Sequence, residues 1–158
     1  MESLDRVFLV KVGLALACGG IIGLERQIRG KPAGVRTSAL ICLGTVIFLH
    51  VSKLLGPADP SRVLGQIVTG IGFLGAGVII TQGGLIKGLT SASVVWVLAG
   101  VGAMIGAQQY LSAMLITGLT LCLLLVMQLF ERAYKLLRRG VHAHDEDQVS
   151  QKQAKEGE

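Results

Sequence analysis

The sequence predicts an all-α, polytopic integral membrane protein that forms a bundle of about five transmembrane helices. Hydrophobic residues make up 51% of the chain and charged residues only 16%, whereas soluble domains carry about 25% charged residues. The apolar residues form continuous runs close to the roughly 20 residues that a helix needs to cross a bilayer. Such runs do not fit a β-barrel, whose strands alternate apolar and polar residues over about 10 positions.

The first helix is expected at residues 7–24. Lys11 interrupts this run, and we expect its ammonium to snorkel to the nearby outer surface. An N-terminal apolar run can also be a signal peptide, but Glu2 and Asp5 precede this one in place of a clean basic segment, and no cleavage site leads into a soluble domain. The run is therefore interpreted as a transmembrane helix.

Four further helices are expected, at residues 37–55, 63–81, 89–107 and 110–130. Pro57 and Pro60 follow the second run, and proline does not continue a helix. Residues 82–84, Gln-Gly-Gly, break the third run. Thr90 or Ser91 is the expected N-cap of the fourth helix.

The distribution of lysine and arginine predicts the orientation of the bundle. With five spans, the loop after the first helix, the loop before the fourth and the tail carry most basic residues on one side. The other side carries only Arg6, Lys11, Lys53 and Arg62. The positive-inside rule therefore predicts that the N-terminus lies outside and the C-terminus in the cytoplasm.

Residues 1–131 are the expected transmembrane domain, and residues 132–158 are expected to form a polar, disordered cytoplasmic tail. The tail has too few apolar residues to form a core. The tail holds a cluster of residues that suits a divalent cation: His142, His144, Asp145, Glu146 and Asp147. The pattern nevertheless favours a solvated tail.

Several classes of function are disfavoured. The net charge of +5 comes from residues beside apolar runs, without the interleaved aromatic and basic residues of an RNA-binding surface, so no nucleic-acid partner is expected. Cys18, Cys42 and Cys122 lie in separate runs and are expected to be packing residues. No constellation of nucleophile, base and acid is visible, so we expect no enzyme and no cofactor.

Residues 70–75 fit the GxGxxG pattern of dinucleotide-binding proteins, but they lack its context. That motif needs an acidic residue about 20 positions on, and this sequence has none between Asp59 and Glu131. The glycines instead suggest close packing of transmembrane helices. The expected helix-packing residues are Gly19, Gly23, Gly70, Gly72, Gly75, Gly77, Gly102 and Gly106.

Polar residues within spans are better functional candidates, because unpaired polar groups are costly in lipid. On the third helix, Gln66, Gly70, Phe73 and Gly77 share one stripe with Thr69 beside it. We expect that stripe to face protein.

A second group of candidates lies near the expected cytoplasmic surface. The second helix starts with Arg36 and Thr37, the fourth starts at Thr90, and the pair Glu25 and Arg26 follows the first helix. Helix N-termini favour anions.

Two interpretations of Glu25 remain open. It either forms a salt bridge to Arg26, Arg29 or Arg36 that fixes the first loop, which we favour, or contributes to an ion or partner site at the inner mouth of the bundle.

Several ordered motifs resemble the signature of the bacterial MgtC/SapB family. They are residues 23–27 (GLERQ), 31–37 (KPAGVRT), 43–44 (LG), 59–63 (DPSRV), 66–77 (QIVTGIGFLGAG) and 88–92 (GLTSA). The resemblance covers roughly residues 10–130. It adds Asp59 and Arg62 to the candidate functional residues.

The resemblance implies a multi-pass protein of the bacterial inner membrane that is linked to growth at low magnesium. Some members of the family look like regulators of other membrane proteins. Ser38 departs from the His or Asn that is more common in the family. The chain is expected to be a short form without the C-terminal ACT-like domain of longer members, which weakens the transfer of their role in virulence.

Two functions remain open. One is a regulator or adaptor whose glycine-rich helices dock against another membrane protein or a second copy in the lipid bilayer. The other is a transporter or channel for Mg²⁺ or another cation. Because Mg²⁺ prefers oxygen ligands, often carboxylates, and no span carries one in its middle, the sequence favours the regulator.

Overall fold

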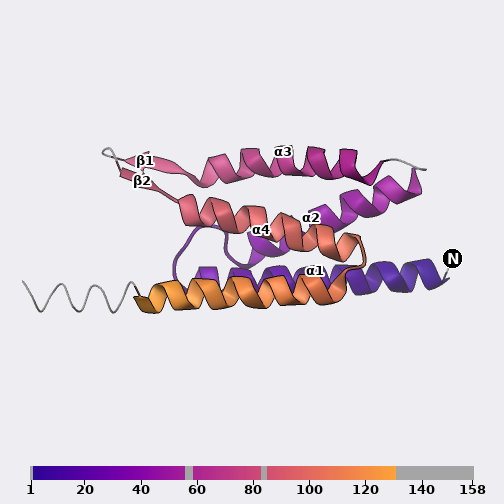
Figure 1. Ribbon diagram of the computed structural model, residues 1–158, viewed down its shortest axis with the longest axis horizontal. Helices are drawn as coiled ribbons and strands as arrows, with labels where there is room; N and C mark the ends of the chain where they lie inside the picture. The colour runs from indigo at the N-terminus through magenta and orange to yellow at the C-terminus, as the bar shows by residue number, and fades with distance from the viewer. Residues whose placement is uncertain (1, 56–58, 83–84, 131–158) are drawn as a thin grey trace, which may run out of the picture. The chain divides into compact units, whose positions relative to one another are not determined.

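The computed structural model describes residues 2–55, 59–82 and 85–130 (Figure 1). Its elements are α1 (Glu2–Ile28), α2 (Val35–Leu54), α3 (Pro60–Val78), β1 (Ile80–Gln82), β2 (Leu85–Lys87), α4 (Leu89–Gly106) and a fifth helix, Tyr110–Phe130. Within this part of the chain, five helices are long and apolar enough to cross a membrane. The predicted fold class is confirmed, and the orientation of the termini stays a prediction.

The first helix is longer than the apolar run predicted, because α1 continues through the polar residues on both sides. It ends at Ile28 in a turn in which Gly30 has a left-handed φ of 60°. The backbone N–H of Gly30 donates to Gln27 O and that of Lys31 to Arg26 O, both at 3.0 Å. This is a Schellman turn, which a glycine at this position stabilises.

The third helix is as long as predicted but shifted toward the N-terminus: it begins at Pro60, and the expected end at Thr81 is wrong. α3 stops at Val78, and β1 then pairs antiparallel with β2, with Ile80 opposite Lys87 and Thr81 opposite Ile86. Isoleucine and threonine are β-branched and favour extended backbone. An apolar β-branched run suits either structure, so hydropathy alone did not separate the last turn of a helix from a strand.

α4 is the central helix of the bundle. α1 packs on α2, and α4 packs on α1, α2 and α3. Half of the span of α4 is buried, compared with 11% of the span of α3. The core therefore lies between α1, α2 and α4, while α3 lies at the periphery (Figure 1). The main core residues of these three helices are Ala15, Cys18, Ile22, Ile41, Cys42, Val46, Leu49, Val94, Val95, Leu98, Val101 and Ile105.

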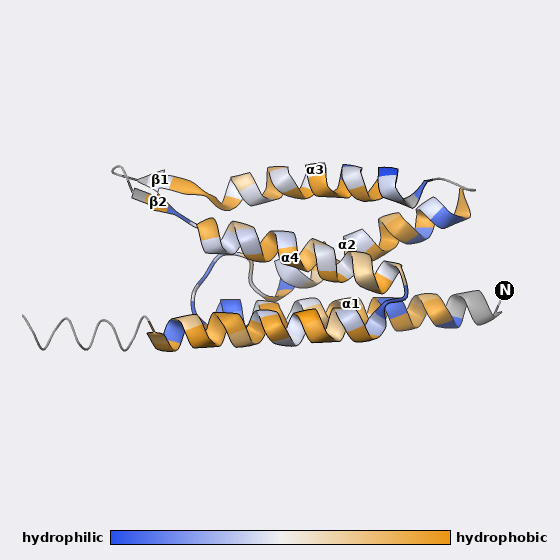
Figure 2. Cartoon of the chain, viewed as in Figure 1, coloured by the Kyte–Doolittle hydropathy of each residue, from blue (hydrophilic) through white to orange (hydrophobic). Residues whose placement is uncertain are grey.

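Hydrophobic residues occur along all the helices (Figure 2). Leu9, Leu40, Phe48, Phe73 and Trp96 are all more than half exposed. A surface of this kind suits lipid, because apolar groups in water would cost free energy in proportion to their area.

Glycines allow close approach at two of the helix contacts. A Cβ added to Gly19 would lie 2.6 Å from Ser38 O, and one added to Gly23 would lie 2.6 Å from Val35 Cα. At the contact of α4 with α2, a Cβ on Gly102 would lie 2.6 Å from Cys42 O. A side chain at any of these positions would force backbones apart.

The chain divides into two units between Leu121 and Cys122. α1 to α4 belong to the first unit, and the fifth helix begins there and continues into the second. Ala113 and Thr117 of the fifth helix are buried within the first unit. The expected tail at residues 132–158, with its histidine cluster, lies outside the described residues.

Candidate functional site

Arg26 is the centre of a buried polar cluster at the end of the bundle that carries loop 29–34 and the β1–β2 hairpin, which we call the hairpin end. Its side chain is only 3% exposed. Nη2 donates to the backbone oxygen of Pro32 at 3.4 Å and to the hydroxyl of Ser91 at the start of α4. One guanidinium thus joins α1, the following loop and α4.

Glu25 lies beside this cluster and pairs with Arg29. Its Oε1 lies 2.9 Å from Arg29 Nε, and 9% of the glutamate side chain is exposed. The structure therefore contains the salt bridge that sequence reasoning favoured, with Arg29 as the partner. Within the described residues, Glu25 Oε2 and Arg26 Nε are buried without a hydrogen-bond partner, which is the arrangement that a bound water or polar ligand satisfies.

Ser38 fixes the loop against the cluster. It is fully buried and donates from Oγ to the backbone oxygen of Ala33 at 3.0 Å. Ala33 has a left-handed φ of 61°, which is uncommon for a residue other than glycine. Gly23 packs so close to Ser38 that a Cβ on the glycine would lie 2.8 Å from that of the serine. A small residue is needed at position 38 in this arrangement.

The other candidates near the hairpin end do not join the cluster. Arg36 and Thr37, in the first turn of α2, are exposed, and so is Thr90. The structure therefore separates Glu25 and Arg26, which are buried together, from three residues that face outward.

At the start of α3, Asp59 acts as a helix cap. Its Oδ1 accepts from Ser61 N at 2.9 Å and from Ser61 Oγ at 2.7 Å. These two hydrogen bonds stabilise the carboxylate and lower the pKa of Asp59. Arg62 is exposed, and the geometry gives Asp59 a structural role at this position.

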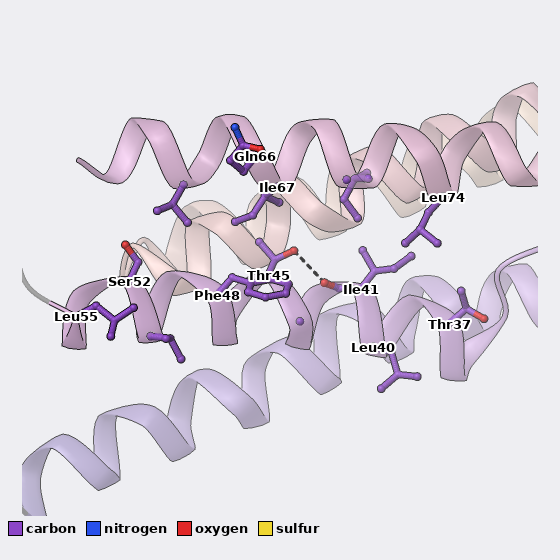
Figure 3. Close-up of a pocket in the computed structure, with 15 residues that line it drawn as sticks. Thr37, Leu40, Ile41, Thr45, Phe48, Ser52, Leu55, Gln66, Ile67 and Leu74 are labelled. Carbon is purple, nitrogen blue, oxygen red and sulfur yellow. Dashed lines mark hydrogen bonds between the residues drawn. The ribbon is translucent and has the colours of Figure 1, made fainter. Parts of the chain in front are cut away.

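Gln66 lines an apolar groove between α2 and α3 with a volume of about 790 Å³ (Figure 3). Gly70 and Thr37 also line it. Thr69 is exposed and donates to the backbone oxygen of Gly65 at 3.0 Å.

The expectation that the whole stripe of α3 faces protein is wrong within this chain. Phe73 is 82% exposed. No atom outside the immediate backbone lies within 4 Å of a Cβ added to Gly70, Gly72 or Gly77, while one on Gly75 would meet Ala92 at 3.8 Å. α3 packs mainly on α4, so most of this stripe is left uncovered. The packing role of its glycines stays a prediction.

Sequence reasoning missed the partner of Lys11. The ammonium does not reach an outer surface: the residue is 3% exposed, and Nζ donates to Gly106 O at 3.0 Å. Lys53 Nζ lies 3.4 Å from the same oxygen. These groups lie at the opposite end of the bundle, at the turn 107–109, which we call the turn end. The position of Lys11 inside an apolar run was the sequence feature that could have indicated a buried partner, because charged residues within spans usually face the interior of the bundle.

The described residues contain no group of three or more His, Cys, Asp or Glu side chains that would suit a metal ion. Glu25 already engages Arg29 and adjoins Arg26. This surrounding is unfavourable for Mg²⁺, which needs several oxygen ligands.

Comparison with known proteins identifies relatives over most of the chain. A sequence model of the MgtC family matches residues 12–133. The chain is 37% identical to the protein MgtC of Salmonella typhimurium strain LT2 over 139 residues, which cover 88% of this chain and 59% of that relative. It is also 39% identical to a putative magnesium transporter, YhiD, of Escherichia coli K12 over 145 residues, 85% of this chain and 66% of the relative.

A third relative, MgtC of Brucella abortus, is 47% identical over 94 residues, 59% of this chain and 40% of the relative. The chain thus spans about 59% of the length of the Salmonella proteins that it matches. No solved structure matches it.

Proposed function

The chain belongs to the MgtC family of multi-pass bacterial inner-membrane proteins, and from that premise we propose that it is a regulator in adaptation to low magnesium. In this proposal it acts by docking against another membrane protein, without catalysis and without a cofactor. The names of the relatives, which include a putative magnesium transporter, motivate the link to magnesium.

The observation that carries the proposal is the basic side chain buried at each end of the α1–α2–α4 bundle. Arg26 lies at the hairpin end and Lys11 at the turn end, each 3% exposed and each bonded to a backbone oxygen. A divalent cation moving along this core would meet a fixed positive charge on entering and on leaving. Repulsion of this kind is strong where water is excluded.

The core between these two ends offers little to a cation. Its polar side chains include Thr45, whose hydroxyl donates to Ile41 O at 3.0 Å, and Cys42, whose thiol donates to Leu98 O at 3.1 Å. The first of these hydrogen bonds lies within α2 and the second joins α2 to α4, so both side chains are already engaged by backbone oxygens. Mg²⁺ gives up its hydration shell reluctantly and needs near-octahedral oxygen ligands, which favours a regulator over a transporter through this core.

α3 provides the surface for docking in this proposal. The open Cβ positions at Gly70, Gly72 and Gly77 leave its backbone accessible, and small residues let a second helix approach closely in a membrane. Phe73 is exposed beside them and would fill a gap on the partner. The partner is therefore expected to be another transmembrane helix.

A second candidate function is cation transport along the groove between α2 and α3. Gln66, Thr37 and Ser52 line this groove (Figure 3), and their oxygens are ligands that a hard cation accepts. The groove has no carboxylate in its lining and is mostly apolar. It is therefore the weaker candidate.

Uptake of Mg²⁺ by proteoliposomes distinguishes the two functions. The purified chain is reconstituted with an entrapped Mg²⁺-sensitive dye, beside protein-free vesicles and the Glu25→Ala and Gln66→Ala variants. We expect no uptake above that of the protein-free vesicles. Uptake that either substitution abolishes would replace the regulator with a transporter.

Docking is tested in cells by crosslinking and copurification. Gly72→Leu on α3 is expected to remove the copurifying membrane protein, because the side chain blocks the exposed backbone. Gly13→Leu is the matched control, since Gly13 also has no atom within 4 Å of its Cβ position but lies on α1. Equal recovery of partners with both variants would exclude α3 as the docking helix.

A further inference from the structure

The end of α4 leaves one backbone oxygen without a backbone partner at the turn end. Gln109 N donates to Met104 O at 2.8 Å, and Gln108 N donates to Ile105 O at 3.0 Å. These two hydrogen bonds form a Schellman turn and use two of the carbonyls that every helix C-terminus exposes. The next oxygen along, that of Gly106, remains available.

Two lysines from two different helices converge on this oxygen. Lys11 on α1 reaches Gly106 O at 3.0 Å, and Lys53 on α2 reaches it at 3.4 Å. Because both nitrogens lie within 3.4 Å of one atom, they are separated by no more than about twice that distance. A helix C-terminus supplies only about half a negative charge, so the terminus itself compensates only part of the positive charge of the pair.

The two carboxylates whose side chains the structure describes, those of Glu25 and Asp59, form no ion pair with the lysines. Glu25 lies on α1 about 21 Å from Lys11 at 1.5 Å per residue, and it pairs with Arg29. Asp59 is engaged by Ser61 in the cap of α3. Each lysine ammonium has three donors and gives one to Gly106 O, so donors remain for a ligand.

Packing holds the two lysines in place. Phe8 and His50 each lie about one turn before a lysine, and their rings contact each other with centroids 4.3 Å apart. On the α4 side, Leu49 packs close to Gly106: a Cβ added to Gly106 would lie 2.8 Å from Leu49 Cδ1. The three helices are thus fixed at the level where the charges meet.

From this convergence of Lys11, Lys53 and an otherwise unpaired helix terminus, we propose that the turn end binds a phosphate-type anion. Lys53 is exposed and lies in the last turn of the span Val35–Leu54, at the level of lipid head groups. On the cytoplasmic side of membranes, basic pockets between transmembrane helices bind such head groups. The phosphate comes either from an anionic phospholipid or from solution.

The test uses the full chain, purified and delipidated in a neutral detergent. Native mass spectrometry follows titration with phosphatidylglycerol and with phosphatidylcholine of the same acyl chains. Thermal unfolding is measured in parallel with sodium phosphate against sodium chloride at equal ionic strength. The variants are Lys53→Gln, which removes the exposed charge, Lys53→Arg, which keeps it, and Lys31→Gln, an exposed lysine at the hairpin end.

We expect Lys53→Gln to weaken phosphatidylglycerol binding roughly tenfold, the effect of losing about one charged hydrogen bond. Lys53→Arg and Lys31→Gln should bind like the wild type. If the bound phosphate belongs to a lipid, phosphatidylglycerol binding weakens in this way and inorganic phosphate has no effect on thermal unfolding. If the ligand is a free anion, sodium phosphate stabilises the wild type, and Lys53→Gln abolishes that stabilisation. The proposal fails if Lys53→Gln binds both lipids and responds to phosphate as the wild type does, or if Lys31→Gln loses as much.

Discussion

Arg26 joins segments that lie far apart in the sequence, and its hydrogen bond to Ser91 spans 65 positions. A buried guanidinium needs such partners, because an unpaired buried charge is costly. Glu25 stays engaged by Arg29 whatever happens at Ser91. The bond to the hydroxyl is therefore the part of the cluster that a single conservative change can remove.

We predict that Ser91→Ala lowers the free energy of unfolding by about 1.5–3 kcal/mol, since it leaves a charged donor of Arg26 without its acceptor. Thermal unfolding in detergent, followed by the fluorescence of Trp96, measures the loss. Ser93→Ala is the control, because Ser93 is exposed and its hydroxyl donates within its own helix, to Leu89 O at 3.0 Å. Equal destabilisation by both changes would contradict a special role for the bond to Arg26.

Asp59 gives a prediction about pH. Its pKa is lowered in the folded protein by the hydrogen bonds from Ser61, so the cap stabilises the fold above the unfolded pKa of about 3.9. This contribution is lost as the pH falls from there through the lower folded pKa. Asp59→Ala should therefore destabilise the start of α3 at neutral pH and make little difference in strong acid.

Hydrogen exchange of the first turn of α3 measures this effect. Asp59→Asn keeps an acceptor for Ser61 and should protect the turn at every pH. A difference between the wild type and Asp59→Ala that is the same at neutral and acidic pH would show that the charge of the cap is irrelevant.

At the scale of elements, a helix or strand can be predicted from the sequence when a local property, such as hydropathy, determines it. The spans follow from hydropathy, because apolar runs of sufficient length leave a helix as the only stable backbone in lipid. The β1–β2 hairpin was missed because Ile79, Ile80 and Thr81 are apolar or neutral, and such residues suit a strand as well as the end of a transmembrane helix. The local sequence pattern cannot distinguish a helix from a strand where tertiary contacts determine which of the two forms.

The candidate site was predictable only in part for a related reason. Glu25 and Arg29 are four positions apart on a helix, a spacing at which side chains meet, so their ion pair could be predicted locally. The partners of Arg26 and Lys11 on α4 lie 65 and 95 positions away. Such contacts depend on how the helices assemble, which no local spacing encodes.

The close contact of α1 with α2 leads us to predict opposite changes in stability for two glycine substitutions on α1. Gly23→Ala should destabilise the protein by about 1–3 kcal/mol, because the new Cβ would meet backbone that cannot move without parting the helices. Gly20 lies on the same helix with no atom within 4 Å of its Cβ position. Gly20→Ala should therefore be neutral or stabilising by up to about 1 kcal/mol, since alanine favours helix.

Thermal unfolding of the two variants under identical detergent conditions compares these values. The same sign and size for both would mean that α1 and α2 do not approach as closely as the structure shows.

At the scale of the whole molecule, the two ends differ in chemistry, and this difference matters only once their sides of the membrane are known. The hairpin end combines Arg26, Arg29 and Arg36 with the buried cluster, while the turn end holds the lysine pair. The positive-inside rule predicts that the hairpin end lies in the cytoplasm. The proposed anion site at the turn end would then lie at the outer leaflet.

Cysteine accessibility tests this orientation. Lys31→Cys at the hairpin end and Gln109→Cys at the turn end both replace exposed residues, whereas the native Cys18 and Cys42 are buried. With Cys122 changed to serine, a membrane-impermeant maleimide should label the position 109 variant in intact spheroplasts and the position 31 variant only after permeabilisation. The reverse pattern would move the lysine pair to the cytoplasmic leaflet, where it would meet cytoplasmic phosphate and the anionic lipids of that surface. Arg26 and Glu25 would then face the outside.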